Sequence, residues 1–242
     1  MHPAPASVKA TFRWPMPVLL ASLLITGAVT VLPAAAADCA DAARPGIDWS
    51  GCSRKNLSLE GANLEGANLR DADLGLTNLR NARLASTDLE EAELMRTSLA
   101  GANADAANLT KAMAYRTDFS GISAKGASFQ SAELQRANFT GAVLTGSNFA
   151  KAELARANFK GATLADNMFG FANLARANFS GVAIGGQADF TGAYMFLTRI
   201  EGTDLSGAKG LAQAQIDLAC GDGATALPAG LVAPATWPCG AE

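Results

Sequence analysis

Histidine is almost absent from this chain: His2 is the only one among 242 residues. Catalytic triads, proton relays and zinc sites commonly use histidine, so these arrangements lack their usual residue. The G-K-[S/T] phosphate loop is missing, as is G-x-G-x-x-G between a strand and a long helix. The densest carboxylate group, formed by Asp88, Glu90, Glu91 and Glu93, is interpreted as a solvated surface. The sequence therefore predicts no catalytic residues, no cofactor, no metal and no enzyme activity.

Long apolar runs are also scarce, and the one that stands out lies near the N-terminus, beginning at residues 18–25. Lys9 and Arg13 precede it, and an A-x-A pattern ends at Ala37. These features predict a signal peptide over 1–37 that is cleaved near Ala37. An uncleaved anchor helix is the alternative, but the run is short and interrupted by polar residues. We expect a periplasmic or secreted protein whose mature chain has no membrane span.

A period of five residues runs through the middle of the chain. Its centres begin at Leu59 and end at Ile184; they comprise 15 Leu, 7 Phe, 1 Ile and 3 Ala. The residue two positions before the centre is Ala, Thr or Ser in 22 of the 26 repeats. A helix requires an apolar period of 3.6 and a flat strand a period of 2. A period of five fits a chain that turns a corner at each repeat, with both positions pointing inward.

The repeats read A-N-L-E-G at 62–66, A-N-L-R-D at 67–71 and A-D-L-G-L at 72–76. They resemble the pentapeptide-repeat family over about 130 residues. The resemblance implies an all-β fold, a right-handed quadrilateral β-helix with four repeats per coil. Residues 20 apart would then stack upon one another, and the solenoid would need no globular core.

Sorting the centres by steps of 20 supports this arrangement, while alternation by ten alone would also fit a two-fold coil. Two opposite columns change from Leu to Phe, beginning at Phe119 and Phe129, and the other two stay aliphatic. Coil spacing would let each Phe column form an offset ring stack. Three centres at the same height are Ala: Ala104, Ala114 and Ala124. They either make room for the first rings or mark a local pocket or bulged coil.

The period slips by one residue after Ile184, since the next centre is Phe190. Two glycines beside the extra residue suit a bulge at a corner. The expected domains are a signal peptide (1–37), an N-terminal cap (38–56), a pentapeptide-repeat β-helix (57–209) and a C-terminal cap and tail (210–242). Residues 211–220 show weak helical periodicity, which predicts a short capping helix.

Four cysteines flank the repeat region in two pairs. Behind an export signal an even number of cysteines predicts disulfides, and four cysteines allow three pairings. Pairing across the ends would have to span the whole solenoid, which disulfide geometry does not permit. We therefore expect bonds from Cys39 to Cys52 and from Cys220 to Cys239.

Five arginines recur every 20 residues: Arg96, Arg116, Arg136, Arg156 and Arg176. In a four-sided coil they form one vertical column. Glu93, Glu133 and Glu153 precede the centres of three of these repeats, so a ladder of Glu–Arg pairs is one interpretation. The other is a basic strip that binds an anionic partner. Charge along the shaft is uneven, with net −4 over 57–99 and net +3 over 100–186.

The leading hypothesis is an exported, non-enzymatic scaffold or protein-interaction module of the bacterial envelope. Its partner would be an unidentified protein or an anionic envelope component; no nucleic acid is expected, and a homo-oligomer is compatible with the sequence. The resemblance also implies an alternative, a DNA-mimicking protein that binds the topoisomerase gyrase. That activity depends on a strongly acidic surface in the cytoplasm, whereas this chain carries an export signal and a basic column.

Overall fold

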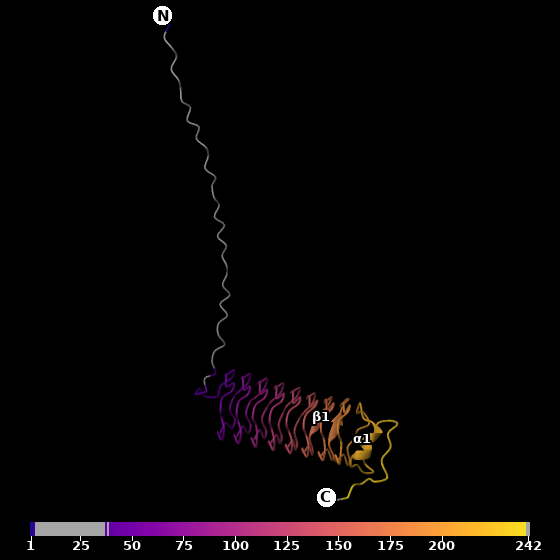
Figure 1. The fold of residues 1–242 in the computed structure, drawn as a ribbon. Coiled ribbons are helices and arrows are strands. Elements are labelled where there is room, and N and C mark those ends of the chain that lie inside the picture. The colour runs from indigo at the N-terminus through magenta and orange to yellow at the C-terminus, as the bar shows by residue number, and fades with distance from the viewer. Residues whose placement is uncertain (3–36, 38, 241–242) are drawn as a thin grey trace. The chain divides into compact units, whose positions relative to one another are not determined.

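A computed structural model describes residues 1–2, 37 and 39–240 of the chain. The signal peptide expected over 1–37 falls almost wholly on residues outside this described part, so it stays a prediction. The chain divides into two units, Met1–Ala35 and Ala36–Glu242, and the second carries every element described below. In this unit the chain winds into a stack of coils that runs from the purple N-terminal end to the yellow C-terminal end (Figure 1).

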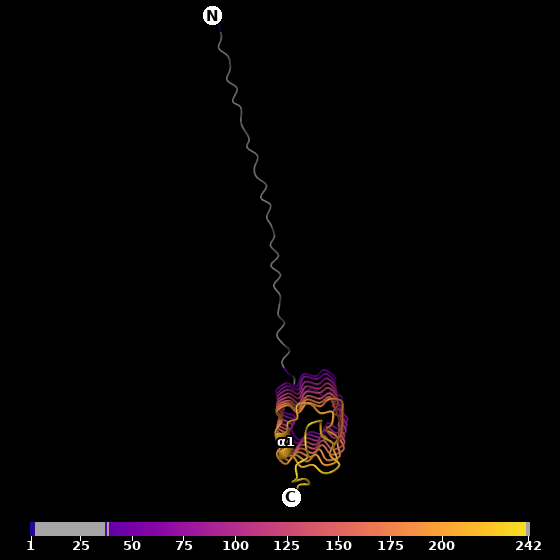
Figure 2. The same ribbon diagram turned by 90° about the vertical axis from the view of Figure 1, so that its right-hand side faces the viewer.

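Parallel bridges hold successive coils together with a register of 20 residues. Asn68 bridges Asp88, and Asp88 bridges Asn108; the other three sides of the coil show equivalent series. Four five-residue repeats therefore complete one coil, which confirms the predicted all-β, right-handed quadrilateral β-helix. Figure 2 shows the four-sided outline of the stacked coils.

Regular elements are short because each side of the coil contributes only a few extended residues before the next corner. Strand β1 spans Thr163–Ala165 and pairs in parallel with β2, which spans Ala183–Gly185. Helix α1 spans Gln213–Leu218. It lies within the segment for which the sequence predicts a short capping helix.

The repeat centres form the core, as the period of five predicts. The Phe centres are buried, and rings within one column stack almost in parallel: Phe119 and Phe139 have centroids 4.8 Å apart and planes 3° from parallel. Phe129 and Phe149 repeat this geometry at 4.7 Å and 5°. These spacings match the distance between hydrogen-bonded strands, so the coil height sets the ring stacking.

The two Phe columns also touch each other, which the sequence analysis did not predict. Phe129 meets Phe119 and Phe139 edge-to-face, with centroid distances of 5.8 and 5.7 Å and interplanar angles of 88° and 89°. Phe190 extends this interlocked stack beyond the slip in the repeat. Edge-to-face pairs contribute about 0.5–1.5 kcal/mol beyond the burial of area. The aromatic half of the shaft is thus one continuous ring cluster.

Polar side chains at the inward position two residues before a centre donate hydrogen bonds to carbonyls of the preceding coil. The hydroxyl of Thr87 donates to the carbonyl of Leu64 at 2.8 Å, and that of Thr97 to the carbonyl of Leu74 at 2.7 Å. Asn167, which departs from the small-residue pattern, donates from its amide to the carbonyl of Leu144 at 2.5 Å. These bonds explain why buried polar side chains can replace alanine here.

The three alanine centres do not interrupt the ladder. Ala104, Ala114 and Ala124 are buried, and the adjacent bridges keep their 20-residue register, as in Asn103 with Ser123. A bulged coil at this height, one of the alternatives considered, is therefore wrong. The smaller side chains lie at the height where Phe119 begins the ring cluster.

The slip after Ile184 appears as an extra residue at a corner. Upstream, Thr163 bridges Ala183 with a separation of 20, whereas Met168 bridges Asp189 with a separation of 21. Gly186 has a φ of 61°, and the N–H of Gln187 donates to a carboxylate oxygen of Asp166 at 2.9 Å. The insertion is absorbed locally, and the predicted bulge is confirmed.

Coiling begins within the segment that the sequence assigned to the N-terminal cap. Ile47 and Trp49 are buried, and Asp48 already bridges Asn68. The guanidinium of Arg54 lies 3.9 Å from the centroid of the Trp49 ring. These apolar side chains therefore occupy inward coil positions themselves.

Coiling also continues into the predicted C-terminal cap, since Arg199 bridges Cys220 and Asp204 bridges Ala226. Trp237 then folds back over this end, and its indole N–H donates to the carbonyl of Ala219 at 2.7 Å. Within the described residues, no helix is both long and apolar enough to cross a membrane.

Candidate functional site

Both predicted disulfides are present at the ends of the solenoid. Cys39 bonds to Cys52, and Cys220 bonds to Cys239. The four cysteines are therefore structural in this fold and supply no free thiol. In the part of the chain that the structure describes, His, Cys, Asp and Glu side chains form no group of three that could hold a metal ion.

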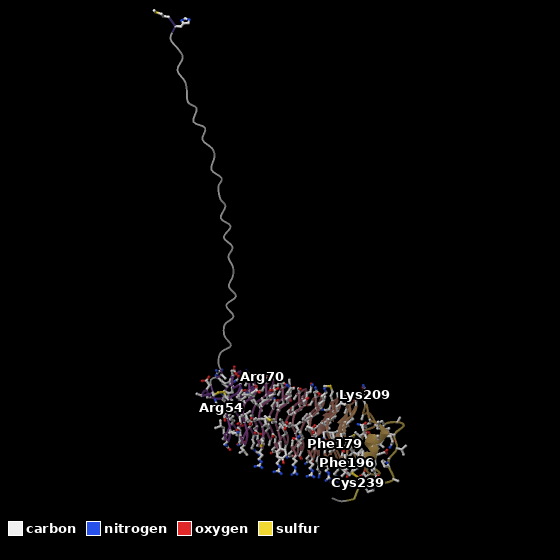
Figure 3. All side chains as sticks on the ribbon, viewed as in Figure 1. Arg54, Arg70, Phe179, Phe196, Lys209 and Cys239 are labelled. Atoms are coloured by element: carbon white, nitrogen blue, oxygen red, sulfur yellow. A yellow bond between two sulfur atoms is a disulfide. The ribbon has the colours of Figure 1, made fainter. Side chains whose placement is uncertain are left out.

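The five predicted arginines form one edge of the solenoid, hereafter the arginine edge. Each occupies the second corner residue after a centre and has a left-handed φ of 56–61°. The backbone N–H of Arg136 donates to the carbonyl of Ala155, and that of Arg156 to the carbonyl of Ala175, both at 2.9 Å. These bonds place the arginines one coil apart. Figure 3 shows nitrogen-tipped side chains projecting in a row from the lower edge of the stack.

The backbone at these corners does not require arginine. On the neighbouring edge, the equivalent residue of the same coils is glycine, with φ values of 63–69°. These glycines, hereafter the glycine edge, are Gly101, Gly121, Gly141, Gly161 and Gly181. A left-handed conformation costs an ordinary L-residue about 1–2 kcal/mol, and glycine avoids this cost. Five successive arginines therefore occupy positions that the local backbone would favour for glycine.

The expected ladder of Glu–Arg pairs is not formed. Arg96, Arg116, Arg136 and Arg156 are exposed, and among the described residues none of them makes an ion pair. The carboxylate of Glu153 instead accepts a hydrogen bond from the side-chain amide of Asn173 at 2.8 Å. The interpretation that these four arginines serve as ion-pair partners of neighbouring glutamates is therefore wrong.

Corner carbonyls are not bound by these arginine side chains either. Each corner carbonyl accepts a backbone N–H from the preceding coil, as Gln135 accepts that of Arg116 at 3.1 Å, and among the described residues the guanidinium groups of Arg96, Arg116, Arg136 and Arg156 donate no hydrogen bond to a carbonyl. The guanidinium of Arg116 lies 5.2 Å from the centroid of the Tyr115 ring. Such a cation–π contact at an exposed site contributes about 0.5–1 kcal/mol and leaves the guanidinium N–H groups accessible.

Charged side chains in the N-terminal coils are paired much more completely than the arginines of the arginine edge. Arg70 pairs with both Asp88 and Glu90, and Lys111 pairs with Glu91 at 2.7 Å. The hydrogen bond and charge of Lys111 hold the pKa of the Glu91 carboxyl below its ordinary value. The reciprocal interaction raises the pKa of Lys111. The negative net charge of this region is therefore largely engaged within the molecule.

The faces on the two sides of the arginine edge differ in chemistry. On one side, the outward ladder carries the exposed carboxylates of Glu133 and Glu153. On the other side, toward the glycine edge, the ladder carries Asn138, Asn158 and Asn178. The side-chain oxygens of Asn138 and Asn158 accept backbone N–H bonds two residues on. Neither ladder beside the arginine edge adds a cation between Glu93 and Asn178.

Exposed apolar side chains end the arginine edge at both extremities. Leu76 and Leu197 occupy the same left-handed corner position one coil before and one coil after the arginines, with φ values of 60° and 52°. Leu76 is 55% exposed, and Met95, whose carbonyl accepts the Leu76 N–H, is 51% exposed. Leu197 is partly buried, and Phe196 immediately before it is 39% exposed. Sequence reasoning found the arginines but missed these ends, although the same 20-residue step leads to Leu76.

Comparisons with known proteins agree with this architecture. The family model described as "Pentapeptide repeats" matches in eight copies, in overlapping windows from 58 to 181, which is 124 of the 242 residues. No curated protein sequence matches the chain.

Solved structures with this likeness include three bacterial or plasmid-encoded proteins. HetL of the cyanobacterium Nostoc sp. strain PCC 7120, a pentapeptide repeat protein involved in regulating heterocyst differentiation, is 24% identical over 78% of this chain and 86% of its own, with a TM-score of 0.32. Rfr23 from the cyanobacterium Cyanothece 51142 is 22% identical over 50% and 87%, with a TM-score of 0.34. A trypsin-treated variant of QnrB1, a plasmid-mediated fluoroquinolone resistance protein, is 20% identical over 76% and 86%, with a TM-score of 0.44.

Proposed function

The chain belongs to the pentapeptide-repeat family, and on that premise we propose that it is an exported, non-enzymatic interaction module of the bacterial envelope. Its arginine edge binds an anionic envelope component. The observation that carries this proposal is the set of four exposed arginines, Arg96, Arg116, Arg136 and Arg156, that make no ion pair with any described residue and are held one coil apart at corners that do not need arginine. Guanidinium groups bind carboxylates and phosphates through two parallel hydrogen bonds, so a straight row of them suits an anionic ligand.

Export is supported by two independent features. The N-terminal pattern ending at Ala37 has the composition of a cleavable signal peptide. Cysteine pairs at both ends of the solenoid suit an oxidising compartment such as the periplasm. An interaction role follows from the surface, because the inward positions are committed to the core and only outward side chains remain to meet a partner.

DNA mimicry, the alternative considered from the resemblance, receives less support. Mimicry needs an extended array of free carboxylates, whereas the acidic N-terminal coils pair many of theirs. Asp73 pairs with Lys55 at 2.5 Å and Glu65 with Arg83 at 2.9 Å. The longest regular row of like charges, the arginine edge, is positive.

Cell fractionation of the full chain, produced with its own leader, tests the proposal. We expect a mature protein that begins near Asp38 in the periplasmic or secreted fraction. We further expect it to sediment with envelope material at low salt and to be released as salt is raised, because exposed charge interactions are screened. A cytoplasmic pool that still begins at Met1, or a complete lack of envelope association, would contradict the proposal.

A further inference from the structure

The arginine edge has a defined length with different chemistry at its middle and its ends. From Leu76 to Leu197 there are six steps between coils, and steps of about 4.8 Å give a length of about 29 Å. The five arginines occupy the middle of this line. Leu76, 55% exposed, and Phe196, 39% exposed, lie toward its two ends.

Backbone hydrogen bonds establish that these residues share one edge. Leu76 donates from its N–H to the carbonyl of Met95 at 3.0 Å, and Arg96 to that of Tyr115 at 3.1 Å. At the other end Arg176 donates to Phe196 at 2.8 Å. Leu76 therefore continues the corner position of the arginines, and Phe196 lies next to that position at the other end. Figure 3 places Phe196 toward the C-terminal end of the stack.

We infer that the partner is a protein, and that the arginine edge binds a segment of this protein that has an acidic middle and apolar ends. This inference rests on the proposed function. Arginine, methionine and aromatic residues are the types enriched at protein interfaces. The edge combines the arginines with Met95, Tyr115 and Phe196. Tyr194 adds to the C-terminal end, since its ring stacks on Phe196 with centroids 6.3 Å apart and planes 10° from parallel.

A membrane surface fits this edge poorly. A flat anionic bilayer would also face the neighbouring ladder, where the exposed carboxylates of Glu133 and Glu153 would be repelled. A uniform anionic polysaccharide would use the arginines but leave the exposed Leu76 and Phe196 in water. A protein segment can satisfy both chemistries, and a helix of about 20 residues, which is about 30 Å long, would cover the edge.

Site-specific photo-crosslinking in cells tests this inference. A benzophenone amino acid replaces Gln135, which lies beside Arg136 on the arginine edge. The matched control places it at Gln130, which holds the same corner position on the preceding edge. We expect a protease-sensitive adduct at Gln135 that is at least about tenfold more abundant than at Gln130. Mass spectrometry of the adduct should identify a partner segment with acidic residues between apolar ones.

Substitutions on the arginine edge test whether its charged and apolar side chains both contribute to the adduct. Charge reversal by Arg116→Glu with Arg156→Glu should lower the adduct yield about tenfold or more, and Leu76→Ser with Phe196→Ser about threefold or more. Lys151→Glu, at a left-handed corner of another edge with φ 60°, should leave the yield unchanged. Circular dichroism of each purified variant shows that it is folded.

Other results would overturn the inference. An adduct that resists protease, that has the mass of two copies of this chain, or that maps to a neutral or basic segment would exclude an acidic protein partner while leaving envelope binding in place. Equal adducts at Gln135 and Gln130 would also exclude it. No adduct at either site together with no envelope association would overturn the proposed function as well.

Discussion

Arg136 and Gly141 hold equivalent corners on adjacent edges of the same coil, with φ values of 60° and 66°. Each donates its backbone N–H to a carbonyl of the next coil, at 2.9 and 3.0 Å. The two edges thus share one backbone geometry, but one carries a long cationic side chain and the other none. The fold therefore requires the left-handed backbone at both corners, whereas the arginine side chain is not required by the fold and is available to a partner.

The first prediction concerns stability at the arginine corner. Arg136→Gly should leave the free energy of unfolding unchanged or raise it by up to about 1 kcal/mol, because glycine relieves a left-handed residue at some cost in chain entropy. The reverse test, Gly141→Ala, should destabilise the protein because alanine must adopt the positive φ. Chemical denaturation monitored by circular dichroism measures both. A loss above about 1 kcal/mol for Arg136→Gly would show that the arginine is structural.

The second prediction concerns the ring cluster. Phe139 is fully buried and contacts four other rings, two stacked and two edge-to-face. Phe139→Ala should lower the free energy of unfolding by about 3–5 kcal/mol through the cavity it leaves. Phe139→Leu should cost clearly less, because Leu99 fills the same column lower in the shaft. Urea denaturation distinguishes the two, and equal losses would argue against a packing role specific to the ring.

The third prediction concerns the buried hydroxyls. Thr97→Val keeps the shape of the side chain but removes the hydrogen bond to the carbonyl of Leu74. That carbonyl still accepts the N–H of Thr77 at 3.1 Å, so the expected loss is modest, about 0.5–1.5 kcal/mol. Thr97→Ser retains a hydroxyl and should recover part of this loss. If Thr97→Val were as stable as the parent protein, the hydroxyl bond would contribute nothing.

The fourth prediction concerns pH at the C-terminal end. The carboxylate of Asp222 accepts the N–H of Gly202 and of Ala224, each at 3.0 Å, and the bond from Gly202 is the main cause that lowers its pKa below 3.8. Because the pKa is lower in the folded state, the stabilisation is present above pH 3.8 and is lost as the pH falls through the folded value. The stability difference between the parent protein and Asp222→Asn should therefore shrink with acidification in thermal melts. A constant difference across this window would contradict the assignment.

The sequence predicted the features that depend on spacing. The period of five predicted a corner at each repeat and the slip before Phe190, the family resemblance implied the four-sided coil, and the columns at steps of 20 supported that coil and predicted the Phe stacks. The ends of the repeat gave the pairing of Cys39 with Cys52. Spacing fixes which residues share a height and a column, so predictions of this kind follow from the sequence.

Spacing does not fix the direction of a side chain or its choice among several polar partners. The edge-to-face contacts between Phe129 and Phe139 depend on ring rotamers, and the bond from Thr87 to Leu64 depends on a hydroxyl reaching the coil below. For the same reason the sequence left open whether Arg136 pairs with a neighbouring glutamate. Coiling at Trp49 was missed because its repeat lacks the usual small residue and Leu or Phe centre.

Envelope binding by the double variant Arg136→Gly with Arg156→Gly tests the central claim most directly. Lys151→Gly is the matched control, since Lys151 is an exposed cation at a left-handed corner of another edge with φ 60°. The amount of each folded protein that sediments with isolated envelope at low salt is measured. The account predicts that binding falls about tenfold or more for the double variant and stays unchanged for Lys151→Gly. Equal binding by the parent protein and the double variant would contradict a role of the arginine edge in recognition.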